Sequence, residues 1–411
     1  MTSGKINLVA PLNRVGFGIY SVEFYFFLQT IYTDISWTVI GTFDEKELDL
    51  FQEELGERAD RQFLKEHIVK SLTTDPYTDA DSIVIWHPNQ MGNDEFHVSS
   101  GARYGITHFE TDKLSTEEIK SMSKFDIVLT CSAWGNEVLE AHNVPTSSTI
   151  HAPIVTYGDY FSEDYLRVPA TRIADYSSAF LGENTCNIFS GGKWESRKDQ
   201  RLQVIALEQN YNRPIMLHSM WHNVFTGGLK EPLEFLLNRG WKLEKTAVAD
   251  ELSVHIFKHP AFGNAITLYP YLLNVGHVSG IHNACDFILS TSKGEGLDQP
   301  LVEGIYNNLI PIATWNTAHM QYLGNGCISL ICEPEIAKDN RWFHGDKGNW
   351  YPTELFEVRH ALKEAVELTL NERYTMLSRA QTTLMDNIEN SRSNLRTFFI
   401  DTKSLKIIQE I

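Results

Sequence analysis

Residues 290–304 read Ser290-Thr-Ser-Lys-Gly-Glu295-Gly-Leu-Asp-Gln-Pro-Leu-Val-Glu303-Gly304, and this segment carries the strongest fold signal of the 411-residue chain. The apolar run Asp286–Ser290 predicts a buried strand that leads into it. Asp298 followed by Pro300 predicts the N-cap and the first turn of a helix. A strand that turns through glycines into a helix is typical of an α/β sheet, whose ligands bind at the carboxyl ends of the strands. We therefore expect a ligand site in this turn.

Two glutamates stand in this segment, one in the turn and one in the helix that follows. Seven residues separate Glu295 from Glu303, so both side chains can face the same pocket. Carboxylates accept hydrogen bonds from vicinal diols, which sugar rings and riboses present. The backbone amides from Gly296 to Asp298 point out of the helix start and suit a phosphate or a hydroxyl. The alternative is a capped helix with one surface glutamate and one structural glutamate.

A second cluster follows the predicted strand Cys186–Ser190 and reads Gly191-Gly-Lys-Trp-Glu-Ser-Arg-Lys-Asp199. Its two glycines let the backbone approach a ligand closely. Lys193 and Lys198 bring two ammonium groups to a predicted helix start, where free amides also favour anions. This composition predicts a diphosphate site, and the alternative is a glycine turn followed by a solvated basic loop. Neither the GxGxxG pattern nor the Walker lysine motif is present.

Strands and helices alternate along the rest of the chain. Further strands are predicted at Ile6–Ala10, Ser36–Ile40, Ser82–Trp86, Tyr104–Thr107, Phe125–Thr130, Ile215–His218, Ala265–Leu268 and Ile310–Thr314. Helices are predicted after a turn at Gly16 and Gly18, at Glu117–Ser123, Trp134–Ala141 and Asp199–Glu208, and along the apolar stripe from Leu355 to Val366. Strands separated by helices imply parallel sheets with helices on both faces.

The length and the restart of this pattern predict two domains. The alternation begins again at Cys186 after an irregular stretch rich in polar residues. We expect an N-terminal domain at 1–155, an interdomain connection at 156–184 and a second domain at 185–370. Residues 371–411 are expected to form C-terminal helices that pack back on the first domain.

The composition excludes several classes of protein. A hydrophobic fraction of 42% can fill two cores, and a formal charge of −18 argues against a broad face for polyanions. The five cysteines are scattered and complete no zinc site, which predicts reduced thiols and a cytoplasmic location. The apolar stretch Ile19–Ile31 is too short and too polar to span a bilayer.

The segment that contains the two glutamates resembles the Glu-x7-Glu signature of the family-4-like retaining glycosyltransferases. In that signature a strand leads to Glu-Gly-Phe-Gly, and a second Glu stands on the helix. Glu295-Gly296 match the first part, and Glu303 matches the second acid. Leu297 stands in place of Phe, and Asp298 in place of the second Gly. A side chain therefore stands where the family has bare backbone beside the donor.

The basic cluster resembles the Gly-Arg-x4-Lys-Gly segment of the same family. Gly192 matches its first residue, Lys193 takes the Arg place and Lys198 matches the Lys. Asp199 stands in the place of the last Gly, and Arg197 is an alternative for the first cation. The resemblance implies that these cations neutralise the leaving diphosphate.

Two weaker matches lie in the first half of the chain. Thr107-His108 after a predicted strand resembles the Thr-x-His segment of the family, with one residue fewer between the two, and His87 is the rival histidine. Gly16-Phe-Gly18 stands where the family's first glycine loop lies. The alternatives are a structural histidine and an ordinary glycine turn.

The resemblance implies the GT-B fold, in which two Rossmann-like, doubly wound, parallel-sheet domains enclose an active site in the cleft between them. It implies a retaining hexosyl transfer from a UDP- or GDP-sugar, with no metal and no cofactor. The implied catalytic residues are His108, Glu295, Lys193 and Lys198. The implied donor-binding residues are Gly16, Gly18, Gly192, Arg197, Gly296, Leu297, Asp298 and Glu303. The first acid is implied to contact the transferred sugar and the second acid the ribose.

The acceptor and some alternatives stay open at this point. A glycan, a lipid-linked sugar, a metabolite, a protein or a modified DNA base is compatible with the pattern, and the net charge disfavours a DNA duplex. A non-catalytic GT-B-like nucleotide-binding scaffold is the main alternative. Asp79-Ala-Asp81 has the form of a metal motif, but it precedes a predicted strand and is read as a strand entry. The aromatic segment Trp342–Tyr351 is interpreted as an insertion, either a sugar contact or a surface loop.

Overall fold

The computed structural model describes residues 2–13, 16–41, 59–154, 181–182, 184–223, 225, 227–249, 252–270, 275–338 and 347–409. The chain divides into two compact units. The N-terminal unit comprises Met1–Phe161 with Asp386–Ile411, and the C-terminal unit comprises Ser162–Met385. Most of the predicted interdomain connection at 156–184 lies outside the described residues.

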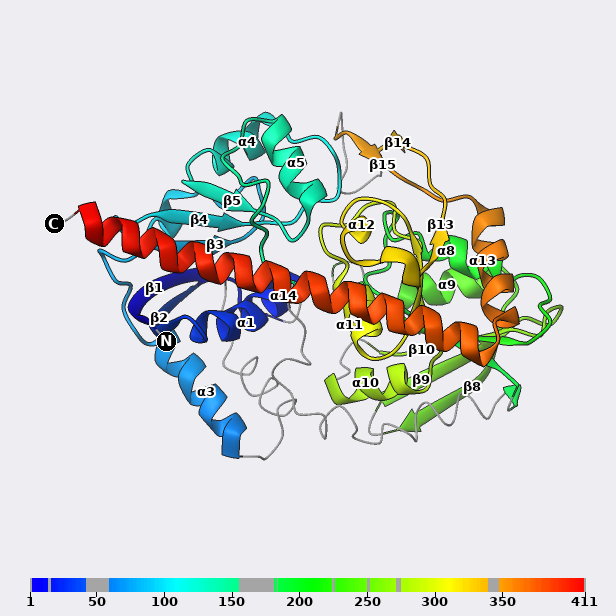
Figure 1. The fold of residues 1–411 in the computed structure, drawn as a ribbon. Coiled ribbons are helices and arrows are strands. Elements are labelled where there is room, and N and C mark those ends of the chain that lie inside the picture. The colour runs from blue at the N-terminus through cyan, green and yellow to red at the C-terminus, as the bar shows by residue number, and fades with distance from the viewer. Residues whose placement is uncertain are drawn as a thin grey trace. The chain divides into compact units, whose positions relative to one another are not determined.

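The N-terminal unit contains a five-stranded sheet of order β2-β1-β3-β4-β5 among its described residues (Figure 1). All four neighbouring pairs run parallel. Its strands are β1 (Thr2–Ala10), β2 (Tyr32–Val39), β3 (Ser82–Ile85), β4 (Arg103–Ile106) and β5 (Ile127–Leu129). Its helices are α1 (Gly16–Gln29), α3 (Ala59–Leu72), η1 (Asp94–Phe96), α4 (Thr116–Met122) and α5 (Ala133–Ala141). From β1 the chain adds β2 on one side of the sheet and β3, β4 and β5 on the other. Doubly wound folds bind ligands at such a switch point.

Helix α1 accounts for the apolar stretch Ile19–Ile31. Its side chains from Tyr20 to Leu28 are buried against the sheet, so this stretch is part of a globular core. No helix within the described ranges is both long and apolar enough to cross a bilayer. The expected turn at Gly16 and Gly18 is wrong, because α1 begins at Gly16 and both glycines lie in its first turn. A Cβ on Gly18 would lie 2.1 Å from the carbonyl oxygen of Asn13, so glycine is required for this close approach.

The C-terminal unit contains an eight-stranded sheet of order β13-β12-β11-β6-β7-β10-β9-β8 in its described part. Its strands are β6 (Cys186–Gly191), β7 (Ile215–Met220), β8 (Lys242–Ala249), β9 (Leu252–Lys258), β10 (Ala265–Leu268), β11 (Phe287–Ser290), β12 (Ile310–Thr314) and β13 (Ile328–Leu330). Six neighbouring strands of this sheet run parallel to one another: β13, β12, β11, β6, β7 and β10. The chain leaves central β6 first on one side and later on the other, which is the doubly wound Rossmann arrangement.

The other elements in the described part of this unit are helices and one small hairpin. The helices are α8 (Gln200–Ala206), α9 (Lys230–Asn238), α10 (Val275–Asn283), α11 (Gln299–Tyr306), α12 (His319–Tyr322), η3 (Gly324–Gly326) and α13 (Leu355–Glu367). The hairpin pairs β14 (Glu335–Ile336) with β15 (Asn349–Trp350). Residues 342–346 of the predicted aromatic insertion lie outside the described residues, but Trp350 of β15 is buried.

The predicted strands are all present, but five further strands, β8, β9, β13, β14 and β15, were not predicted. Strands β8 and β9 pair antiparallel with each other, and β9 pairs antiparallel with β10. The expectation of a purely parallel sheet is therefore corrected at this edge. Only two residues separate β8 from β9, and so short a connection joins antiparallel strands. Charged residues such as Lys242, Glu244 and Lys245 mask the apolar pattern of β8.

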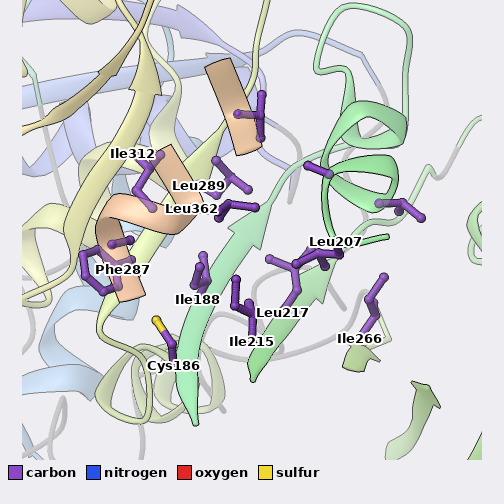
Figure 2. Packing of buried hydrophobic residues seen from close by; sticks show 14 of the residues in the cluster. Cys186, Ile188, Leu207, Ile215, Leu217, Ile266, Phe287, Leu289, Ile312 and Leu362 are labelled. Carbon is purple, nitrogen blue, oxygen red and sulfur yellow. The ribbon is translucent and has the colours of Figure 1, made fainter. Parts of the chain in front are cut away.

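The core of the C-terminal unit lies on one face of this sheet. Buried Ile188, Leu217, Leu289 and Ile312 pack with Leu362 of α13, and Figure 2 shows these side chains gathered around the strands. Successive strand residues point to opposite faces. Ile288, beside Leu289 in β11, therefore points to the other face, which α11 covers.

Residues 371–411 were expected to form more than one helix, and a single helix, α14 (Leu370–Gln409), occupies nearly all of them (Figure 1, red). Its residues up to Met385 belong to the C-terminal unit and those from Asp386 to the N-terminal unit. In the N-terminal unit, the ring of Phe399 contacts the rings of Tyr32 and Tyr104. The C-terminal segment is thus part of the aromatic packing of the N-terminal unit.

The contact between α11 and β11 yields a first testable prediction. A Cβ at Gly304 would lie 2.6 Å from Cδ1 and 3.2 Å from Cγ2 of Ile288, so Gly304→Ala should push the helix from the sheet. We expect a loss of about 1–3 kcal/mol in unfolding free energy, measured by urea denaturation. Ile288→Val in the same chain should restore part of it. Gly263→Ala, which meets no atom within 4 Å, is the control. Equal midpoints for Gly304→Ala and wild type would contradict this packing.

Candidate functional site

The two predicted clusters of the C-terminal unit leave neighbouring strands, β6 and β11. These strands flank the point at which the sheet reverses its winding, where the two loops diverge and leave space for a ligand. The loops are joined at their bases, because the Lys293 amide donates to the Arg197 carbonyl at 2.8 Å. The Thr291 hydroxyl also donates to the Lys198 carbonyl at 3.0 Å. The sheet topology therefore brings the two clusters together.

Lys198 is the centre of a buried ion cluster. Its ammonium lies 2.7 Å from Oε1 of Glu295 and 2.7 Å from Oδ1 of Asp298. Burial alone would lower the pKa of Lys198, but the two carboxylates outweigh burial and raise it. The pKa of Asp298 is raised by burial, yet Lys198 and His319 outweigh this effect and hold it well below its usual range. Lys198 and Asp298 are therefore both ionised at neutral pH.

Arg197, and not Lys193, is the second cation of this cluster. Its guanidinium lies 2.6 Å from Oε1 of Glu295 and 2.7 Å from Oε1 of Glu195. The Lys193 side chain is exposed, and its ammonium lies over the ring of Phe225 at 5.5 Å. The structure thus brings Arg197 to the first acid, which agrees with the alternative reading of the basic motif.

Three polar side chains that contact this cluster were not predicted from the sequence. His319 Nε2 lies 2.9 Å from Oδ2 of Asp298, and the Ser290 hydroxyl donates to the same oxygen at 2.7 Å. The Ser292 hydroxyl donates to Oε1 of Glu295 at 2.5 Å. His319 begins α12 shortly after β12, the strand next to β11. The rule that functional side chains follow strands could therefore have identified it.

Two aspartates, which stand where the motifs that the sequence resembles have glycine, share an unusual backbone conformation. Asp199 has φ 52° and Asp298 has φ 60°, both in the left-handed region. Glycine adopts this region freely, and aspartate is among the few other residues that do so. Asp298 stands at the N-cap position of α11 as predicted, but its side chain makes no capping hydrogen bond. The ion cluster holds the carboxylate instead.

Other predicted donor-binding residues line the same loops. Gly192 has φ 118°, and a Cβ there would lie 3.2 Å from Cε of Lys198. Gly296 and Leu297 are buried between Glu295 and Asp298, and the Tyr322 hydroxyl donates to the Leu297 carbonyl. The backbone therefore passes close to the cluster on both loops.

Glu303 stands on α11 with a half-buried side chain. Burial, with a further contribution from the Asp298 charge, raises its pKa to about 8. Glu303 thus carries a proton at neutral pH, in contrast to Asp298. A protonated carboxyl donates one hydrogen bond and accepts others, which matches the two hydroxyls of a diol.

In the N-terminal unit, His108 directly follows Thr107 at the carboxyl end of β4. Its ring packs against Phe17 at 5.3 Å and Tyr20 at 4.9 Å between centroids. Neither buried ring nitrogen has a hydrogen-bond partner among the described residues. Burial and the neighbouring His87 lower its pKa to about 4, so the ring is neutral. A buried polar group without a partner is rare in native structures, which makes this ring a candidate for a hydrogen-bonding role.

The rival histidine lies in the same aromatic cluster. The ring of His87 is 4.6 Å from that of Phe17, whose helix begins with Gly16 and Gly18. The predicted residues of the N-terminal unit thus lie beside one another after β3 and β4. That these residues share a site with the ion cluster of the C-terminal unit stays a prediction.

Metal ligation finds no support within the ranges that the structure describes. No group of three or more His, Cys, Asp or Glu is placed there to hold a metal ion. Asp81 accepts a hydrogen bond from the Ala102 amide at 2.9 Å, which ties the start of β3 to β4. This contact gives the Asp79-Ala-Asp81 motif a structural role at the strand entry. All five cysteines are free.

Sequence comparison does not classify the chain. No protein-family model matches it, and no curated protein matches it in sequence.

Solved structures match nearly the whole chain. A UDP-forming α,α-trehalose-phosphate synthase from Burkholderia vietnamiensis has a TM-score of 0.61 at 12% identity, covering 98% of this chain and 99% of that one. An Anabaena protein in complex with UDP and glucose has a TM-score of 0.59 at 11% identity, with the same coverage. A sucrose-phosphate synthase from Thermosynechococcus elongatus has 0.54 at 11% identity, covering 99% and 100%. The likeness shows that the fold is GT-B, as expected.

The raised pKa of Glu303 predicts a pH-dependent stability. Between the unfolded pKa near 4.3 and the folded value of about 8, the folded chain binds one proton more than the unfolded chain. This carboxyl therefore lowers stability as pH rises, by up to about 1.4 kcal/mol per pH unit. Glu303→Gln removes the ionisation, so its stability relative to wild type should increase from pH 5 to pH 8 in urea titrations. Glu364→Gln, at an exposed position of α13, is the control. A difference that does not change with pH would contradict the assignment.

Proposed function

We propose that this GT-B chain is a glycosyltransferase that moves a sugar from a nucleotide diphosphate sugar to a hydroxyl acceptor. The proposal includes retention of the anomeric configuration and independence from metal ions. The observation that carries it is the buried cluster of Lys198, Arg197 and Glu295 at the switch point of the C-terminal sheet. The names of the structural neighbours, which are synthases or complexes with UDP, support this class of reaction.

The proposed roles follow from charge and position. Transfer requires that the bond between the sugar carbon and the phosphate oxygen breaks while negative charge grows on the leaving diphosphate. Lys198 and Arg197 are buried, and cations in such a site stabilise that charge more strongly than they do in water. Glu295 accepts hydrogen bonds from the sugar hydroxyls, and protonated Glu303 engages the ribose diol.

The acceptor side of the proposed reaction involves the N-terminal unit. Neutral His108, whose ring nitrogens have no hydrogen-bond partner in the described part of the chain, serves as a hydrogen-bonding contact for the donor sugar. The acceptor oxygen forms the new bond to the sugar carbon, and the leaving phosphate takes the acceptor proton. No strong general base is needed for this step. UDP-sugars are the first donors to test, because UDP occurs in the names of several neighbours.

A non-catalytic nucleotide-binding scaffold is the second candidate, and one observation favours it. The Asp298 carboxylate already pairs with the Lys198 ammonium at 2.7 Å, whereas a catalytic site would need this cation available for the donor. Donor binding without transfer or donor hydrolysis would select this candidate. Metal-free incubation with nucleotide sugars and overnight product analysis distinguishes the two.

The transferase proposal predicts the effect of removing its central cation. Lys198→Ala should lower the turnover of a donor found by thermal-shift screening by about 100-fold or more, because leaving-group charge loses its nearest ammonium. Release of nucleoside diphosphate in EDTA is the measurement, and circular dichroism verifies the fold. Lys230→Ala removes an exposed lysine from the same unit and should keep full activity. Full activity of a folded Lys198→Ala variant would remove this residue from the mechanism.

A further inference from the structure

The charged side chains of the ion cluster in the C-terminal unit are paired with one another. Both nitrogens of His319 face acceptors, since Nδ1 lies 2.9 Å from the Thr314 carbonyl and Nε2 lies 2.9 Å from the Asp298 carboxylate. The ring therefore lies between two hydrogen-bond acceptors. The cluster joins the cations Arg197 and Lys198 to the anions Glu195, Glu295 and Asp298, and His319 contacts Asp298. Among the described residues, each of these side chains thus already has a partner within the cluster.

Asp298 uses both of its carboxylate oxygens within this cluster. Oδ1 accepts from the Lys198 ammonium at 2.7 Å, and Oδ2 accepts from the Ser290 hydroxyl at 2.7 Å and from His319 at 2.9 Å. We call these three donor groups the anion site. An ammonium, a histidine ring and a hydroxyl are also groups that hold a phosphoryl oxygen. The chain has therefore built an anion site and placed its own carboxylate in it.

The backbone at Asp298 indicates that the side chain is the reason for this residue. Its φ of 60° and ψ of 64° lie in the left-handed region, which glycine would occupy without a steric penalty. An aspartate persists there with its carboxylate fully hydrogen-bonded and buried. Asp199 provides an internal comparison, because it has the same backbone region but pairs with Lys293 at 3.6 Å.

We infer that Asp298 is a built-in competitor for the diphosphate of the donor, and that donor binding requires this carboxylate to leave Lys198. The inference rests on the proposed function for the identity of the ligand. A diphosphate that enters this cluster meets three carboxylates at close range, and Coulomb repulsion opposes it. Release of Asp298 from the anion site provides the Lys198 ammonium, the Ser290 hydroxyl and the His319 ring for the incoming phosphate. Asp298 therefore weakens the binding of diphosphate ligands in general.

Calorimetric titration with inorganic pyrophosphate and with UDP tests this competition. Asp298→Asn keeps the shape of the side chain and removes its charge, and Asp298→Gly removes the side chain at a backbone suited to glycine. Both variants should bind both probes about tenfold or more tightly than wild type, because a charge-assisted hydrogen bond no longer has to break. Affinity should also fall more steeply with salt concentration in the variants than in wild type.

Asp199→Asn is the matched control, since it removes the same charge from the same backbone conformation beside Lys293. Its affinity for pyrophosphate should stay within about twofold of wild type, because its effect is limited to screened, longer-range electrostatics. An equal gain in this variant would overturn the inference in favour of a general charge effect. Unchanged or weaker binding by both Asp298 variants would also overturn it. If Asp298→Asn fails to fold, the affinity of Asp298→Gly and its salt dependence relative to wild type provide the decision.

The same measurements separate this inference from the proposed function. Pyrophosphate carries no sugar, so its binding does not depend on transfer. Tighter pyrophosphate binding by the variants without turnover of any nucleotide sugar would support the competition and reject the transferase. Turnover by wild type, with no affinity gain in the Asp298 variants, would support the transferase and reject the competition.

Discussion

The buried contact of Lys198 with Glu295 and Asp298 is the interaction on which the candidate site depends. It joins a loop after β6 to a loop after β11, two segments that are about a hundred residues apart in the chain. Removing one partner of a buried ion pair typically costs about 3–5 kcal/mol, because the remaining charge stays desolvated. The same pairs that hold the loops in place therefore also set the electrostatics of the site.

This contact is possible because of the order in which the C-terminal sheet is wound. Strand β6 is central, and β11 reaches its side only after the chain has passed through β7, β8, β9 and β10. Both loops then start from the same edge of the sheet. Gly304 contributes through packing, since it lets α11 approach Ile288 and so orients the helix that begins after Asp298. Winding and close packing together position Asp298.

Much of this architecture could be predicted from the sequence. Buried strands such as Ala265–Leu268 and Ile310–Thr314 were predicted with their observed bounds, because continuous apolar runs bounded by turns identify central strands. The β8–β9 hairpin was missed, since its edge position leaves β8 with charged side chains that hide the pattern. The structure groups Lys198 with Glu295 as the motifs suggested, while the Lys193 ammonium lies over the ring of Phe225.

The sequence by itself determined the fold class, the two strand-to-loop segments and the presence of aspartates where the related motifs have glycine. These features are local, because hydrophobic periodicity, turn residues and helix starts are written in neighbouring positions. Only the tertiary structure decided that Arg197 and His319 join the cluster and that Asp298 turns toward Lys198. Those choices depend on long-range winding and on which charges share a desolvated space, and no short stretch of sequence records either one.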